Sequence, residues 1–136
     1  MENKKRGKRF EELNVKNLIL IFVIVLGIVL IFTAIDYYVH SLSEEYAVPS
    51  YYFRNKIIFG TGIGFIAYIF IRKLKWYYRS FVFSAIISIL LQTRYFLEGY
   101  ALKFVFEFMR FHFLMLLPVS MIVFKLLDKK LKGGSR

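Results

Sequence analysis

The run from Leu18 to Ile35 contains no ionisable side chain, and it constrains the fold more than any other feature of the chain. At about 1.5 Å per residue, a helix of this length covers most of the ~30 Å hydrocarbon core of a bilayer. The run is longer than the apolar part of an ordinary secretory signal, and no small-residue cleavage site follows it. We therefore expect it to be retained as a transmembrane helix.

Three further apolar blocks follow, each separated from the next by a short charged segment. Hydrophobic residues make up 58% of the 136 residues, against about 45–50% in a soluble domain. The blocks predict spans over residues 18–38, 53–71, 77–97 and 104–126, within a transmembrane domain of residues 17–127. Short basic tails, residues 1–16 and 128–136, flank this domain. The predicted fold class is all-α, an antiparallel four-helix membrane bundle.

The basic residues are distributed in a way that predicts the orientation of the bundle. Most of the 20 lysines and arginines lie in the two tails and in the short connection between the second and third spans. Cytoplasmic segments of membrane proteins carry such an excess of basic residues. We therefore expect a multi-pass protein of the cell membrane with both termini in the cytoplasm. The long connection from residue 39 to residue 52 then lies outside, where its length allows a short helix. Lys56, near one end of the second span, is expected to snorkel towards the membrane surface.

Small residues predict where two of the helices approach each other. Gly60, Gly64 and Ala67 share one face of the second span, and Ser80, Ser84, Ser88 and Gln92 recur every fourth residue along the third. We predict that these two faces pack together, as small residues do in lipid. The alternatives are a hinge or a ligand contact at the glycines, and one wall of a polar pathway along the serines.

The ionisable residues inside the predicted spans are candidates for a polar pocket, because charged groups in a membrane usually face the bundle or water. Lys103, Glu107 and Arg110 follow a helical spacing of four and three residues, so Glu107 is the expected partner of Arg110, unless this turn protrudes as a solvated ladder. Asp36 and His40 are four residues apart. The candidate pocket comprises Asp36, His40, Gln92, Arg94, Glu107, Arg110 and His112, all in the outer half of the bundle.

The candidate residues also have other interpretations. Asp36, His40 and His112 together would form a two-histidine, one-carboxylate metal set, but the pattern is weak, and we predict neither a metal site nor a cofactor. Asp36 has a second interpretation, as an interfacial residue bonded to a tyrosine or to Arg94. The chain has no cysteine, which excludes thiolate metal ligands and thiol catalysis. No complete catalytic set is present.

These observations favour a small, non-enzymatic membrane protein that acts as an accessory, scaffold or assembly subunit. One alternative is a small oligomeric transporter or channel with an outward-facing polar pocket, and another is a membrane-embedded enzyme that acts at the outer leaflet. The expected partners are membrane lipids, with anionic headgroups at the cytoplasmic face, and a second copy or another protein. The net charge of +11 is explained by topology and lipid contact, so no nucleic acid is predicted.

Overall fold

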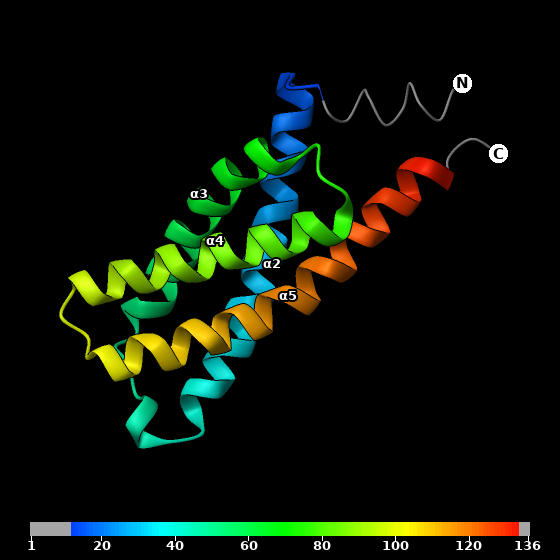
Figure 1. The fold of residues 1–136 in the computed structure, drawn as a ribbon. Coiled ribbons are helices and arrows are strands. Elements are labelled where there is room, and N and C mark those ends of the chain that lie inside the picture. The colour runs from blue at the N-terminus through cyan, green and yellow to red at the C-terminus, as the bar shows by residue number, and fades with distance from the viewer. Residues whose placement is uncertain (1–11, 134–136) are drawn as a thin grey trace.

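The structure, a computed structural model, describes residues 12–133, with side chains described as far as Lys129. Four long helices and one short 3-10 helix make up this part of the chain, and it contains no strand (Figure 1). The elements are α2 (Val15–Ser41), η1 (Glu44–Tyr46), α3 (Tyr51–Ile71), α4 (Trp76–Leu97) and α5 (Leu102–Gly133). The all-helical prediction is confirmed, and η1 is the short helix that the long connection allowed. Most of the predicted N-terminal tail lies outside the described residues.

All four long helices are long and apolar enough to cross a membrane, which indicates a multi-pass membrane protein. The shortest of them, α3, has 21 residues and is therefore about 32 Å long, close to the thickness of the hydrocarbon core. Each helix extends past the predicted span at one or both ends, by as little as one residue at the start of α4 and as many as seven at the end of α5. The predicted limits followed the apolar runs, whereas backbone hydrogen bonding continues into the polar boundary until a cap or a turn stops it.

Local sequence explains two of the helix ends. The side chain of Asn14 accepts a hydrogen bond from the backbone N–H of Asn17 (2.9 Å), and α2 begins directly after it. After α4, Gly99 adopts a left-handed backbone with φ of 96°, a conformation that glycine adopts without strain. This glycine lets the chain turn within four residues into α5. The connection between α4 and α5 is therefore short and tight.

The connections lie at two ends of the bundle. In Figure 1 the connection between α3 and α4 is on the same side as the start of α2, while the connections α2–α3 and α4–α5 lie at the opposite end. The most extensive helix contact is between α4 and α5, and α2 packs against both α3 and α5. The core consists of aliphatic and aromatic side chains from all four helices.

The glycines of α3 lie against two neighbouring helices. A Cβ added at Gly64 would come within 2.8 Å of Val25 on α2 and 3.1 Å of Ile87 on α4, and one at Gly60 within 3.2 Å of Val29. Gly60 and Gly64 thus lie where α3 closely approaches its neighbours, and Ala67, on the same face, is also buried. The expected partner was wrong, because α4 meets the glycines with large apolar residues and not with its serines.

The serine face of α4 is turned towards α5 instead. The hydroxyl groups of Ser84 and Ser120 lie 3.1 Å apart across that interface, and Ser80 donates to the carbonyl of Trp76 (2.7 Å) in its own helix. Ser80, Ser84 and Ser88 are all buried. Small side chains thus bring α4 close to α5 on one side, while the glycines bring α3 close to α2 and α4 on the other.

This packing makes Gly64 and Gly62 a matched pair for mutation. We expect Gly64→Ala to lower the unfolding free energy by about 1–3 kcal/mol, the usual cost of overpacking, because its Cβ would overlap Val25. Nothing lies within 4 Å of a Cβ at Gly62, so Gly62→Ala should be neutral or stabilising by up to about 1 kcal/mol through helix propensity. Thermal unfolding in detergent measures both, and equal effects of the two variants would contradict the close approach at Gly64.

Candidate functional site

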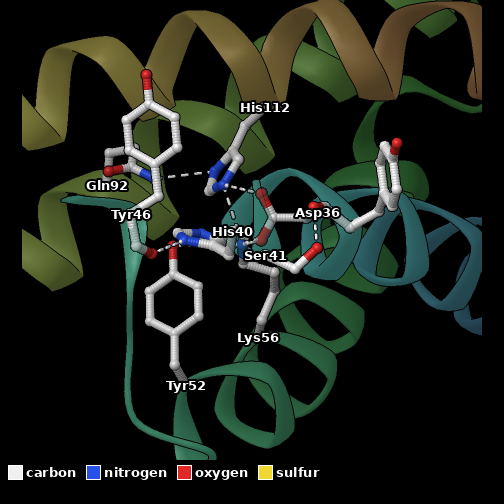
Figure 2. Close-up of polar contacts among 9 residues, drawn as sticks. Asp36, His40, Ser41, Tyr46, Tyr52, Lys56, Gln92 and His112 are labelled. Carbon is white, nitrogen blue, oxygen red and sulfur yellow. Dashed lines mark hydrogen bonds and ion pairs between the residues drawn. The ribbon is translucent and has the colours of Figure 1, made fainter. Parts of the chain in front are cut away.

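One side chain from each of the four long helices meets at a buried polar centre. Asp36 comes from α2, Lys56 from α3, Gln92 from α4 and His112 from α5, and each side chain is completely buried. Figure 2 shows these four groups converging, with Tyr52 and His40 beside them. We call Asp36, Lys56, Gln92 and His112 the central cluster. It joins the whole bundle, because no two of its members come from the same helix.

The charged groups of the central cluster contact each other directly. The ammonium group of Lys56 donates a hydrogen bond to a carboxylate oxygen of Asp36, lies 2.9 Å from Nε2 of His112 and 3.3 Å from the hydroxyl of Tyr52. The second oxygen of Asp36 is 3.2 Å from the same Nε2. The ammonium group also lies 4.4 Å from the centre of the Tyr52 ring, at a distance typical of cation–π contact. Each charge thus has an opposite charge or a dipole beside it.

Two expectations about these residues were wrong. Lys56 does not snorkel, because its side chain is buried against the Asp36 carboxylate. A carboxylate in the bundle interior needs a nearby positive charge, and Lys56 supplies it from the adjacent helix. The interfacial interpretation of Asp36 was also wrong, since Arg94 pairs with Glu98 at 2.6 Å in its own helix and stacks on Phe59.

Both ring nitrogens of His112 have buried polar neighbours. Nε2 lies 2.9 Å from the Lys56 ammonium and 3.2 Å from Oδ1 of Asp36, so it can accept from the lysine or, when it carries the ring proton, donate to the carboxylate. Nδ1 lies 2.8 Å from the side-chain amide of Gln92, which offers both a donor and an acceptor. The amide can therefore pair with either tautomer of the ring.

His40 connects the central cluster to the end of the bundle. Its Nδ1 lies 2.5 Å from the backbone carbonyl of Tyr46 in η1, and its Nε2 lies 3.4 Å from Asp36. The carbonyl can only accept, so Nδ1 carries a proton and donates to it. The ring also stacks on Phe108, with centroids 4.4 Å apart. His40 thereby fixes η1 over the cluster.

An aromatic layer continues from His40 towards the α4–α5 connection. Phe104 packs between Phe108 (4.5 Å between centroids) and Tyr100 (5.2 Å). Tyr100 lies outside the membrane-spanning segments, and partial burial raises the pKa of its phenol, which therefore stays protonated at neutral pH. These rings separate the cluster from the end of the bundle.

The residues of the two-histidine, one-carboxylate pattern surround an ammonium group. Asp36, His40 and His112 do lie together, as a two-histidine, one-carboxylate set would require. However, the part of the chain that the structure describes contains no group of three or more histidine, cysteine or acidic residues placed to hold a metal ion. Instead the Lys56 ammonium contacts both Asp36 and His112 and supplies the positive charge between them.

The sequence-predicted pocket residues separate into two groups. Asp36, His40, Gln92 and His112 come together, whereas Arg94, Glu107 and Arg110 lie apart from them. Within the described residues no ion pair joins Glu107 to Arg110: Glu107 is half-buried, and Arg110 and Lys103 are exposed. The expected partnership within this ladder was therefore wrong, because spacing alone does not fix where long side chains point.

Sequence reasoning missed two participants. Lys56 and Tyr52 are four residues apart on α3, and this spacing on one helix face was the available signal. At the other end of the bundle Arg79 is also buried, where it lies 3.5 Å from Asp128, 3.3 Å from the Tyr68 hydroxyl and 2.7 Å from the Leu74 carbonyl. The end with the basic connections thus contains a buried charge as well.

Comparisons with protein-family models, with curated proteins and with solved structures found no match. The class of protein therefore follows from the fold and the site. It is a small multi-pass helical membrane protein with a buried, charge-compensated centre to which every long helix contributes.

The contact between Gln92 and His112 can be tested on its own. We expect Gln92→Leu to lower the unfolding free energy by about 1–3 kcal/mol, because Nδ1 of His112 would remain buried without a hydrogen-bond partner. Thr93→Val is the control: Thr93 is exposed and donates only to Ile89 of its own helix, so its effect should stay within about 0.5 kcal/mol. Denaturant titration in detergent measures both variants. If Gln92→Leu and Thr93→Val had the same denaturation midpoint, the Gln92 amide would not be the hydrogen-bond partner of the His112 ring.

Proposed function

We propose that this protein is a non-enzymatic membrane protein that acts as an accessory, scaffold or assembly subunit. We further propose that the central cluster fixes its helices in register. The observation that carries the proposal is that one fully buried polar side chain from every long helix pairs with the others. Such a centre is a device for specifying structure, since a shift of any helix would leave a buried charge or hydrogen-bonding group unpaired.

The chemistry of the cluster supports this function over the two alternatives. Lys56 contacts Asp36 and His112, and both ring nitrogens of His112 have neighbours. A transported ion or a substrate would have to break these contacts in a low-dielectric interior, at a cost of several kcal/mol per separated charge. The buried hydroxyls of Ser84 and Ser120 also contact each other. The groups present therefore favour a static role.

A double-mutant cycle on Asp36 and Lys56 tests the structural role. We expect Lys56→Met to destabilise the bundle by about 3–5 kcal/mol, because it leaves the buried carboxylate uncompensated. Asp36→Asn combined with Lys56→Met should recover most of that loss, since the pair is then neutral and the amide can still bond to the histidines. Unfolding in detergent gives the free energies.

The same variants separate a scaffold from a transporter. Vesicles that contain the wild-type protein should pass protons and small cations no faster than empty vesicles. A flux that the wild type supports and that the folded double variant lacks would overturn the proposal and favour transport. Additive effects in the cycle would instead show that the two charges are not coupled in the folded protein.

We further propose that both termini lie in the cytoplasm and that η1 lies outside, with helices alternating in direction. The basic residues of the α3–α4 connection and of the chain before α2 support this orientation under the positive-inside rule. The absence of cysteine from the chain makes single introduced cysteines specific probes.

The orientation predicts opposite labelling of two exposed positions. Ala47→Cys, after η1, should react with a membrane-impermeant maleimide on intact cells, whereas Lys73→Cys, between α3 and α4, should react only after the membrane is opened. The cysteine-free parent controls for background. The reverse pattern would invert the topology without affecting the argument about the central cluster.

A further inference from the structure

Two lysines lie over two aromatic rings at the end of the bundle that carries the α3–α4 connection. The ammonium group of Lys125, on α5, is 5.4 Å from the centre of the Trp76 ring at the start of α4. That of Lys75 is 6.0 Å from the Tyr77 ring, and the two rings contact each other with centroids 5.6 Å apart. Figure 1 shows the start of α4 beside the later part of α5. We call Lys75, Trp76, Tyr77 and Lys125 the basic surface.

The length of α4 places the basic surface at a boundary of the membrane. α4 begins at Trp76, has 22 residues and is apolar enough to cross a bilayer. It is therefore about 33 Å long, close to the ~30 Å thickness of the hydrocarbon core. Its first residues thus lie at the level of the lipid headgroups, where tryptophan and tyrosine are common. The contact with the Trp76 ring places Lys125 at the same level.

The lysines of the basic surface have no counter-charge among the described residues. Lys75 and Lys125 are exposed, and neither forms an ion pair in this part of the chain. Asp128 follows Lys125 by three residues, but it lies 3.5 Å from the buried Arg79. Lys73, in the α3–α4 connection, is exposed and adds a further positive charge. The local field is therefore positive, and an anion is the kind of ligand that it attracts.

Exposed apolar side chains follow one turn deeper in the membrane. Phe81 comes four residues after Tyr77 on α4, and Ile122 three residues before Lys125 on α5, so each shares a helix face with a member of the basic surface. Phe81 is 56% exposed and Ile122 is 61% exposed. Both helices thus present a basic or aromatic group at the boundary and apolar surface towards the middle of the membrane. A phospholipid has the same order, with a charged headgroup above acyl chains.

We propose that the basic surface binds the phosphate group of one anionic phospholipid, whose acyl chains lie over Phe81 and Ile122. The rings restrict where the two ammonium groups lie, which gives the phosphate a defined position. A free phosphate would leave the apolar side chains uncovered, so a phospholipid is the source that fits the whole surface. The charge distribution alone predicts a general attraction to anionic headgroups, whereas this proposal names one site. It does not depend on the proposed accessory function.

Lipid binding to the full chain in a non-ionic detergent, measured by native mass spectrometry, tests the proposal. The probes are dioleoyl phosphatidylglycerol, which is anionic, and dioleoyl phosphatidylcholine, which has the same acyl chains and no net charge. We expect one molecule of phosphatidylglycerol to be retained in preference to phosphatidylcholine. If the lysines served only to orient the chain in a membrane, no such preference would exist in detergent. An excess of inorganic phosphate should leave the lipid bound, because the acyl chains contribute to the contact.

Three single variants locate the site. Lys75→Gln and Lys125→Gln should each weaken phosphatidylglycerol binding about fivefold, and the two together about 25-fold, because each basic residue near an anionic headgroup contributes about 1 kcal/mol. Lys103→Gln is the matched control: it removes another exposed lysine, at the opposite end of the bundle, and should leave binding unchanged. Unfolding curves check that every variant is folded.

Three results would contradict this site. Equal losses from Lys103→Gln and Lys125→Gln would mean that lipid binds only through the net positive charge of the chain. Equal retention of the two phospholipids by the wild type would mean that the basic residues serve topology alone. Displacement of the lipid by inorganic phosphate would show that the headgroup charge accounts for binding without a contribution from Phe81 and Ile122.

Discussion

The ion pair between Asp36 and Lys56 is the contact on which the arrangement of the four helices depends. In a membrane, apolar side chains gain little free energy by packing against each other instead of against lipid. Burial of apolar surface therefore does not select one helix packing over another. A buried carboxylate does select one packing of the helices, because it must remain beside the ammonium group on the next helix. Gln92 and His112 extend the same requirement to α4 and α5. The bundle therefore has a specified register at its polar centre.

Close packing makes this centre possible. Gly64 and Gly60 let α3 approach α2 and α4, and this approach brings the Lys56 side chain within reach of Asp36 on α2. On the other side, Ser84 and Ser120 meet where α4 crosses α5. The small residues control the distances between helices, and the charged residues control their rotation and axial position. The two sets share one face of α3 and one of α4, because Lys56 lies four residues before Gly60 and Gln92 lies eight after Ser84, and they serve complementary purposes.

The sequence was sufficient to predict the number and class of the helices but only part of the site. Run lengths such as Leu18 to Ile35 report a local property, the ability to cross a bilayer, and local properties can be seen in a single chain. The meeting of Asp36 with Lys56 depends on the rotation of two helices about their axes, and no spacing within one helix determines that rotation. For the same reason Glu107 and Arg110 were paired by spacing although no ion pair joins them in the described chain.

Lys56 and Arg110 show that the meaning of a charge in a transmembrane helix depends on its surroundings. Lys56 is buried, with a carboxylate, an imidazole and an aromatic ring around it. Its charge is compensated within the chain. Arg110 is exposed on the outside of the bundle, and no carboxylate of the described chain pairs with it. The same kind of side chain therefore joins helices where it is buried beside an opposite charge, and leaves the packing of the bundle unaffected where it is exposed.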